Sequence, residues 1–489
     1  MSVLRGVLVT ALLLHAGACG KDPAALRIAN GPDPSSLDPH LASSVSEGRI
    51  LSSLWAGLTK SNPTNLEVMP GLAETWTPSE NGRIWTFKIR DNLRWSDGSP
   101  LTTKDVKASW VRLQNPKTGA PYQNWVADAS ISTSSNSVRI EFPNPQPQFP
   151  AMCSWPALAP IPPGLRNENE IPGEVSSGPY TLKYWKIRDR VRVIRNPFYW
   201  KKNSEAPESI DFLTVESSFT ALNLFLSGEV DWTPLVPRLA ALALVKKKEP
   251  SFSASPRLGT TFLRFQAPPS SIHDYSTIKT LSDAIDRKKL AEVVGPGSIP
   301  AISLTPPGLP GYAPPLPSRF SHPVKPKLHG RLELIFPSSD ANRIVAEFLQ
   351  DQWKRNLGVE VLLVNQEWKA FLRTQQSGNY QISLSSWIAD YPDPLSFLEI
   401  FHSDSGNNRT GWENIQYDTL LDMASQEGNP SERLKILRRA ESLLIRGGPI
   451  VPLTHEAGTD LISSQWSNIR PGPMGNINWE RIRPRSGAK

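Results

Sequence analysis

The sequence is poor in cysteine and histidine and has no long apolar run, and these shortages exclude several classes of protein. Two cysteines in 489 residues cannot form a disulfide-rich scaffold or supply the thiolate ligands of an iron–sulfur or all-cysteine zinc site. The seven histidines show no metal-ligand spacing. No stretch reaches the roughly eighteen apolar residues of a membrane-spanning helix. We therefore expect no metal, no cofactor and no transmembrane anchor.

The charge is also too even for a nucleic-acid-binding protein. The chain carries 53 Lys and Arg against 46 Asp and Glu, a formal net charge of +7, and its basic residues form no dense cluster. With 39% hydrophobic residues and 16 tryptophans, the composition is that of a folded globular protein. The length is about twice what one hydrophobic core usually serves. The chain should therefore fold into two or more lobes.

Common catalytic signatures are missing as well. The sequence contains no G-x-S-x-G, H-E-x-x-H, G-x-x-x-x-G-K-[ST] or G-x-G-x-x-G motif. We expect no catalytic residues and no enzyme activity. An exported peptidase or glycosidase-like enzyme stays open as an alternative, because acidic residues are too numerous for the sequence alone to exclude an acid/base pair.

The N-terminus has the pattern of an export signal. Arg5 precedes an apolar run from Gly6 to Leu14, and the small residues of Ala16–Ala18 stand directly before Cys19. We predict a lipoprotein-type signal peptide over residues 1–18, with Cys19 lipidated as the first mature residue. Cleavage at the same place without lipidation is the alternative. The other cysteine, Cys153, is then unpaired and is expected to be a buried, inert thiol.

Strand and helix patterns alternate along the chain, which predicts an α/β fold. Apolar residues on one helical face predict a helix from Ser339 to Asn356, followed by a strand over 359–364. A helix with a threonine cap is predicted from Thr103 through Arg112. The alternation over Ile84–Ile89 and the turn within Asn92–Ser99 together suggest a hairpin.

Several short sequence segments, taken in their order along the chain, are typical of one protein family. They are Pro34–His40, Leu54–Leu58, Pro70–Trp76, Phe87–Thr102, Ser177–Tyr180, Arg195–Trp200, Gly228–Asp231, Ala284–Arg287 and Trp387–Pro394. In this order they resemble the family 5 extracellular solute-binding proteins of oligopeptide and dipeptide ABC transporters. The resemblance covers nearly all of the chain after the signal segment.

The resemblance implies a two-lobe α/β fold of the periplasmic-binding-protein type, with a hinge between the lobes. Lobe I would comprise residues 24–257, including an extra subdomain at about 60–165, and residues 465–489 would return to it. Lobe II would comprise residues 258–464. A chain that crosses twice between lobes can hinge there and close on a ligand.

The resemblance also implies a function. The chain would be an extracytoplasmic, membrane-anchored lipoprotein, periplasmic or on the cell surface, that captures peptides between its lobes and delivers them to an ABC importer. Its partners would be the peptide, the permease subunits and the membrane, and we expect it to be a monomer.

Four residues match ligand-binding positions of the family. Asp390, at the end of a Trp-x-x-Asp phrase, would accept the α-ammonium group that every unblocked peptide carries. Trp387 and Trp368 match aromatic positions near side-chain pockets, and Val45 matches a backbone contact from the opposite lobe. The alternative reading of Asp390 is a turn former beside Pro392.

One stretch departs from the oligopeptide binders. Some of them place arginines before the Trp-x-x-Asp phrase, where they reach the ligand carboxylate, whereas this chain has Ile382–Ser386 without any basic residue. Recognition of a peptide C-terminus is therefore left open. A non-peptide ligand such as a nickel chelate or an oligosaccharide also stays open, because a fold does not fix its ligand.

Overall fold

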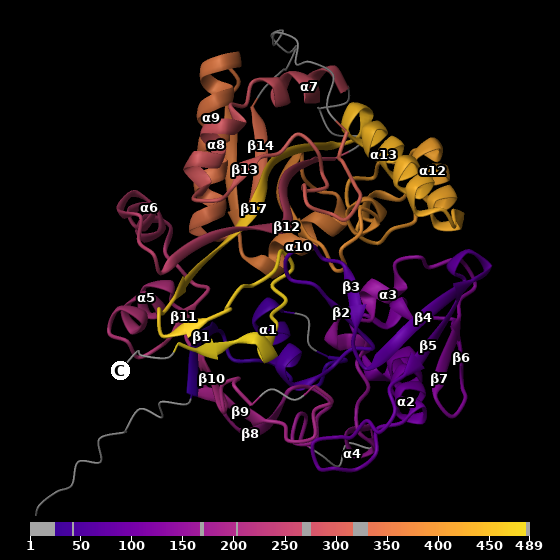
Figure 1. The fold of residues 1–489 in the computed structure, drawn as a ribbon. Helices are drawn as coiled ribbons and strands as arrows, with labels where there is room; N and C mark the ends of the chain where they lie inside the picture. The colour runs from indigo at the N-terminus through magenta and orange to yellow at the C-terminus, as the bar shows by residue number, and fades with distance from the viewer. Residues whose placement is uncertain are drawn as a thin grey trace, which may run out of the picture.

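The computed structural model describes residues 25–41, 44–166, 171–201, 204–266, 275–315 and 331–485. The predicted signal peptide and Cys19 lie outside the described residues. Figure 1 shows an α/β molecule of two lobes, with the N-terminal half of the chain in the lower lobe and most of the C-terminal half in the upper one. We refer to them as lobe I and lobe II.

One large mixed sheet runs through both lobes. Its strand order is β15 (Val361–Gln366), β14 (Leu332–Pro337), β16 (Ile382–Ile388), β12 (Phe252–Phe265), β17 (Ile450–Ile462), β11 (Trp232–Thr233), β1 (Ala25–Gly31), β10 (Ser209–Thr214), β9 (Arg190–Arg195) and β8 (Tyr180–Lys186), and β13 (Ile299–Pro300) pairs with β17. The strands up to β16 lie in lobe II and those from β11 onward lie in lobe I.

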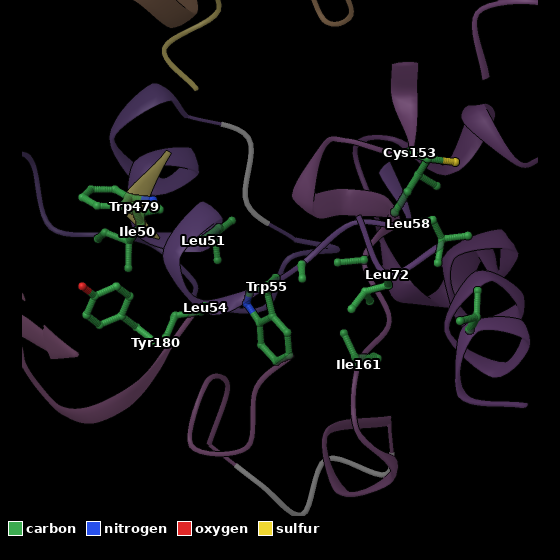
Figure 2. Packing of buried hydrophobic residues seen from close by; sticks show 14 of the residues in the cluster. Ile50, Leu51, Leu54, Trp55, Leu58, Leu72, Cys153, Ile161, Tyr180 and Trp479 are labelled. Atoms are coloured by element: carbon green, nitrogen blue, oxygen red, sulfur yellow. The ribbon is translucent and has the colours of Figure 1, made fainter. Parts of the chain in front are cut away.

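Lobe I also contains a smaller antiparallel sheet. Its order is β4 (Ala73–Ser79), β5 (Ile84–Ile89), β7 (Ser137–Glu141) and β6 (Ser130–Thr133), and a short hairpin of β2 (Thr59–Ser61) and β3 (Val68–Pro70) precedes it. The helices of this lobe are α1 (Val45–Leu54), α2 (Thr103–Gln114), α3 (Phe149–Met152), α4 (Pro163–Arg166), α5 (Ser218–Leu226) and α6 (Arg238–Lys247). Helix α1 packs its apolar face into one core with residues from distant segments, among them Tyr180 and Trp479 (Figure 2).

Helices cover the lobe II part of the large sheet. They are α7 (Tyr275–Asp283), α8 (Arg287–Val294), α9 (Asp340–Leu357), α10 (Trp368–Ser377), α11 (Leu395–Leu398), α12 (Ile415–Gln426) and α13 (Pro430–Gly447). The buried apolar residues of this lobe form two large clusters, one of which also includes Leu66 of lobe I, while Tyr391 of lobe II packs into the core of lobe I. Most of the buried apolar residues of each lobe pack within that lobe, which allows the lobes to move as units.

Two long antiparallel strands, β12 and β17, connect the lobes. Their ladder is interrupted between the pairs Pro256–Ala457 and Thr260–His455, where three residues of β12 face the single residue Glu456. After β17 the chain passes β18 (Trp466–Ser467) and β19 (Arg483–Pro484), and the buried side chains of Trp466 and Trp479 join the lobe I core. The last described segment is therefore part of lobe I in its packing.

Local predictions from sequence were mostly confirmed. Helix α9 has Ser339 as its N-cap and Gly358, with φ +71°, as its C-cap, as its capping pattern predicts. Helix α2 begins with a capping box between Thr102 and Asp105. The hairpin prediction was wrong, because β5 pairs with β4 and β7 while Asn92–Ser99 forms turns.

Candidate functional site

The end of β16 brings two of the predicted residues together. The Trp387 indole Nε1 donates a hydrogen bond of 2.7 Å to the carbonyl oxygen of Ser396, and the Asp390 backbone N–H donates one of 2.9 Å to the Ser396 hydroxyl. Ser396 is buried at the start of α11. The backbone around Asp390 is thus held in place without using the Asp390 side chain.

The Asp390 carboxylate has no hydrogen-bond or ion-pair partner among the residues that the structure describes. It is largely buried, and burial raises the pKa of Asp390 to about 6. A buried carboxylate without a cation is costly, because the charged form loses water and gains nothing in return. Such a group is a candidate for binding a cation supplied by a ligand.

Asp390 lies where the two lobes meet. The next residue, Tyr391, packs edge-on against Trp125 of lobe I with ring centroids 6.2 Å apart. Burial, together with the charge of Asp390, raises the pKa of Tyr122, also in lobe I. The aromatic side chains of Tyr122 and Trp125 in lobe I therefore lie near the Asp390 segment from across the boundary.

The lobes also approach at a second place. A Cβ added to Gly428, between α12 and α13, would lie 2.6 Å from the Asn81 side-chain oxygen of lobe I. This is closer than real Cβ atoms come, so a larger residue at position 428 would displace the Asn81 side chain. The contact between these turns and the Trp125–Tyr391 contact both hold the lobes together.

Other carboxylates lie behind Asp390, inside lobe II. Asp393 accepts two hydrogen bonds from the Arg433 guanidinium, of 2.7 and 3.0 Å. The Tyr391 hydroxyl donates a 2.9 Å bond to Glu399. Burial raises the pKa of Glu399 to about 7; the charges of Asp390 and Asp393 add to the rise, while the Tyr391 hydrogen bond and Arg433 oppose it. Asp393 is thus neutralised by Arg433, whereas Asp390 has no cation among the described residues.

The remaining predicted residues are exposed and stand apart. Trp368 begins α10 with 57% of its surface exposed and stacks on Phe371. Val45 begins α1, is 54% exposed, and lies beside Gly475 of the C-terminal segment. No hydrogen bond or ring contact between described residues joins either side chain to Asp390 or Trp387. Their exposure leaves them accessible to a ligand.

Sequence reasoning missed Tyr122 and Glu399 as neighbours of Asp390. Tyr122 stands close to Trp125 in the sequence, and such an aromatic pair between predicted elements was a signal for an interaction site. Glu399 gave no signal in the sequence, because nothing distinguishes it from the many other glutamates before the fold is known.

Two further observations concern the described residues as a whole. None of their His, Cys, Asp and Glu side chains gather in groups of three or more that could hold a metal ion. Within the same ranges, no helix combines the length and apolarity needed to cross a membrane. Cys153 is buried as predicted, and burial raises the pKa of its thiol well above the ordinary value.

Known proteins resemble this chain over most of its length. It is 29% identical to the periplasmic murein peptide-binding protein MppA of Escherichia coli, over 86% of each chain. A solved structure of MppA in its unliganded open form matches with a TM-score of 0.80 at 27% identity, covering 94% of this chain and 97% of that one. The periplasmic oligopeptide-binding protein OppA of Salmonella typhimurium is 28% identical over 97% of each chain.

A third relative carries a different ligand in its name. The probable deoxycholate-binding periplasmic protein YgiS of Escherichia coli is 28% identical over 88% of each chain. Residues 67–409 match the middle region of the family described as bacterial extracellular solute-binding proteins, family 5. This match covers well over half of the sequence and agrees with the two-lobe fold. The chain therefore belongs to the family 5 bacterial extracellular solute-binding proteins.

Proposed function

We propose that this chain captures peptides between its two lobes and passes them, unchanged, to an ABC importer. One observation carries the proposal: the largely buried Asp390 carboxylate at the lobe boundary has no cationic partner among the described residues. A peptide α-ammonium would supply the missing charge and hydrogen-bond donors. The names of MppA and OppA, which describe peptide binders, support the same ligand class.

The other predicted residues are assigned complementary roles. Trp387, held by Ser396, and the exposed Trp368 offer apolar surface to ligand side chains, and Val45 offers a backbone contact from lobe I. Extended main-chain hydrogen bonding would make binding tolerant of sequence. None of these roles involves a chemical reaction, so the protein acts as a binding protein and not as an enzyme.

We place the lobe boundaries at residues 257/258 and 464/465, with lobe I formed by 24–257 and 465–489 and its subdomain at about 60–165. The interrupted ladder between Pro256 and Thr260 supports the first crossing. Bending at these strands would open and close the boundary around Asp390. Small-angle scattering should then show a smaller radius of gyration when ligand is added.

The proposed cellular context is a monomer held at the membrane by lipids on Cys19, on the periplasmic or outer side of the cell, that docks on permease subunits. The export pattern before Cys19 supports it. A single acyl chain gives only marginal membrane attachment, so stable anchoring requires more than one chain on this residue. Mass spectrometry of the N-terminal fragment would detect the added mass.

The ligand class is tested by asking what the purified protein retains. The protein is denatured after extensive washing, and released molecules are identified by mass spectrometry. We expect peptides with free amino termini, which then bind again to the refolded protein. Recovery of only a bile acid, an oligosaccharide or a nickel chelate, or cleavage of an added peptide, would overturn the proposal.

A further inference from the structure

Helices α5 and α6 expose an unusual amount of apolar surface. Their exposed large side chains, which we call the α5–α6 patch, are Phe219 (65%), Leu226 (69%), Leu239 (71%), Leu242 (37%) and Val245 (49%). The described residues contain 18 such exposed large apolar side chains, so more than a quarter of them fall within a stretch of 27 residues. A concentration of this kind marks an interaction surface on a soluble domain.

The core of lobe I does not account for this patch. Helix α5 already packs an inner face, with Ala221 buried and Leu224 and Phe225 partly buried against Val230. The exposed residues lie on other faces. In α6 the three exposed residues are spaced three apart, which places them along one stripe, and in α5 the two are seven apart, again on one stripe. Each helix thus carries an apolar stripe that the described part of lobe I leaves partly or largely exposed.

Basic residues border the patch. Lys246 and Lys247 end α6 and Lys248 caps it, and all three are exposed and form no ion pair among the described residues. Apolar stripes flanked by lysines are typical of helices that lie in the interface of an anionic lipid bilayer, with the apolar residues inserted and the lysines at the headgroups.

The patch also lies close to the proposed lipid anchor. The N–H of Asp231, a few residues after the end of α5, donates to the carbonyl of Arg27 in β1, and Figure 1 shows α5 beside β1 with α6 next to it. Strand β1 begins at Ala25, only six residues after Cys19. Six residues span about 20 Å at most, so a lipid on Cys19 would hold this side of lobe I near the membrane.

We propose that the α5–α6 patch rests on the surface of an anionic lipid bilayer and fixes how the anchored protein is oriented. The placement of this side toward the membrane rests on the proposed lipid anchor. The apolar and basic character of the patch does not depend on the anchor. The Cys19→Ser protein should therefore bind vesicles without any lipid of its own.

The test measures cosedimentation of the Cys19→Ser chain, prepared without the predicted signal peptide of residues 1–18, with vesicles of phosphatidylglycerol and phosphatidylcholine, and with phosphatidylcholine alone. We expect binding to the anionic vesicles that weakens with added salt. Adding Phe219→Ser and Leu239→Ser should reduce binding at least tenfold, and changing Lys246, Lys247 and Lys248 to Gln should remove the preference for anionic lipid. The matched control is Ile415→Ser, which removes a side chain of 82% exposure from α12 of lobe II and should change nothing.

Three outcomes would overturn the proposal: no vesicle binding by the Cys19→Ser chain, equal loss in the Ile415→Ser control, or dimers in light scattering that disappear with the patch substitutions. Retention of ligand by every variant shows that each is folded. Because vesicle binding and ligand binding are measured separately, failure of one does not decide the other.

Discussion

Two neighbouring aspartates of lobe II, Asp390 and Asp393, differ in whether a cation compensates their charge. At the lobe boundary Asp390 is largely buried without a cation among the described residues, whereas three residues later Asp393 is held by both arms of Arg433. A compensated buried carboxylate serves the fold, and an uncompensated one costs the fold free energy and is available to a ligand. The difference separates a structural acid from a candidate binding acid within one short loop.

The largest expected effect is on stability, from the interior pair. Asp393→Asn leaves the Arg433 guanidinium, only 6% exposed, without its carboxylate, which should cost about 3 to 5 kcal/mol in the free energy of unfolding. Urea denaturation measures this loss. Combining Asp393→Asn with Arg433→Met should recover part of it, and the folded fraction should still bind peptide. An unchanged urea midpoint in the single variant would contradict the structural role.

The next effect is on binding, from the boundary acid. Asp390→Asn removes the charge opposite the peptide ammonium and should weaken binding by about 2 to 5 kcal/mol, a factor of roughly 30 to several thousand. Acetylating the peptide N-terminus should weaken wild-type binding similarly. The two changes together should lose much less than the sum of both, because they remove one interaction. Calorimetric titration of the four combinations would show additive losses if Asp390 were only a turn former.

The same Asp390→Asn substitution should stabilise the empty protein. The folded pKa of Asp390, about 6, lies above its ordinary value of 3.8, so the ionised carboxylate destabilises the fold as pH rises from about 4 to 6 and remains unfavourable above that. The variant should gain up to about 3 kcal/mol at pH 7.5 and nothing near pH 3.5. Urea midpoints at both pH values test this. A less stable variant at pH 7.5 would mean that the carboxylate has a stabilising partner.

The smallest expected effect, counted per pH unit, is the pH dependence of the affinity for peptide. Because only the ionised carboxylate pairs with an ammonium, affinity for a free peptide should fall below pH 6, by about tenfold per unit at the steepest. An acetylated peptide lacks the ammonium and should show no such fall. Dissociation constants measured from pH 4.5 to 7.5 for both peptides separate this effect from general acid destabilisation, which would affect both alike.

Much of the local structure followed from the sequence. The helix from Ser339 and the helix at Thr103 are specified by their own caps and apolar spacing, which act over a few residues. The hairpin predicted at Ile84–Ile89 failed because β5 takes its partners from Ala73–Ser79 and Ser137–Glu141. Strand pairing at that separation depends on the packing of the whole subdomain. The alternation of residues alone does not predict which strand becomes the partner.

The sequence by itself determined the family, the two-lobe α/β class and Asp390 as the candidate binding residue, because these depend on phrases of adjacent residues. Only the tertiary structure distinguished Asp390 from Asp393, placed Tyr122 and Trp125 of lobe I across from that loop, and gathered the α5–α6 patch near the start of β1. The physical reason is that charge compensation and burial belong to residues brought together in space. Arg433 lies 40 residues from Asp393, and nothing local tells which of two nearby aspartates it will meet.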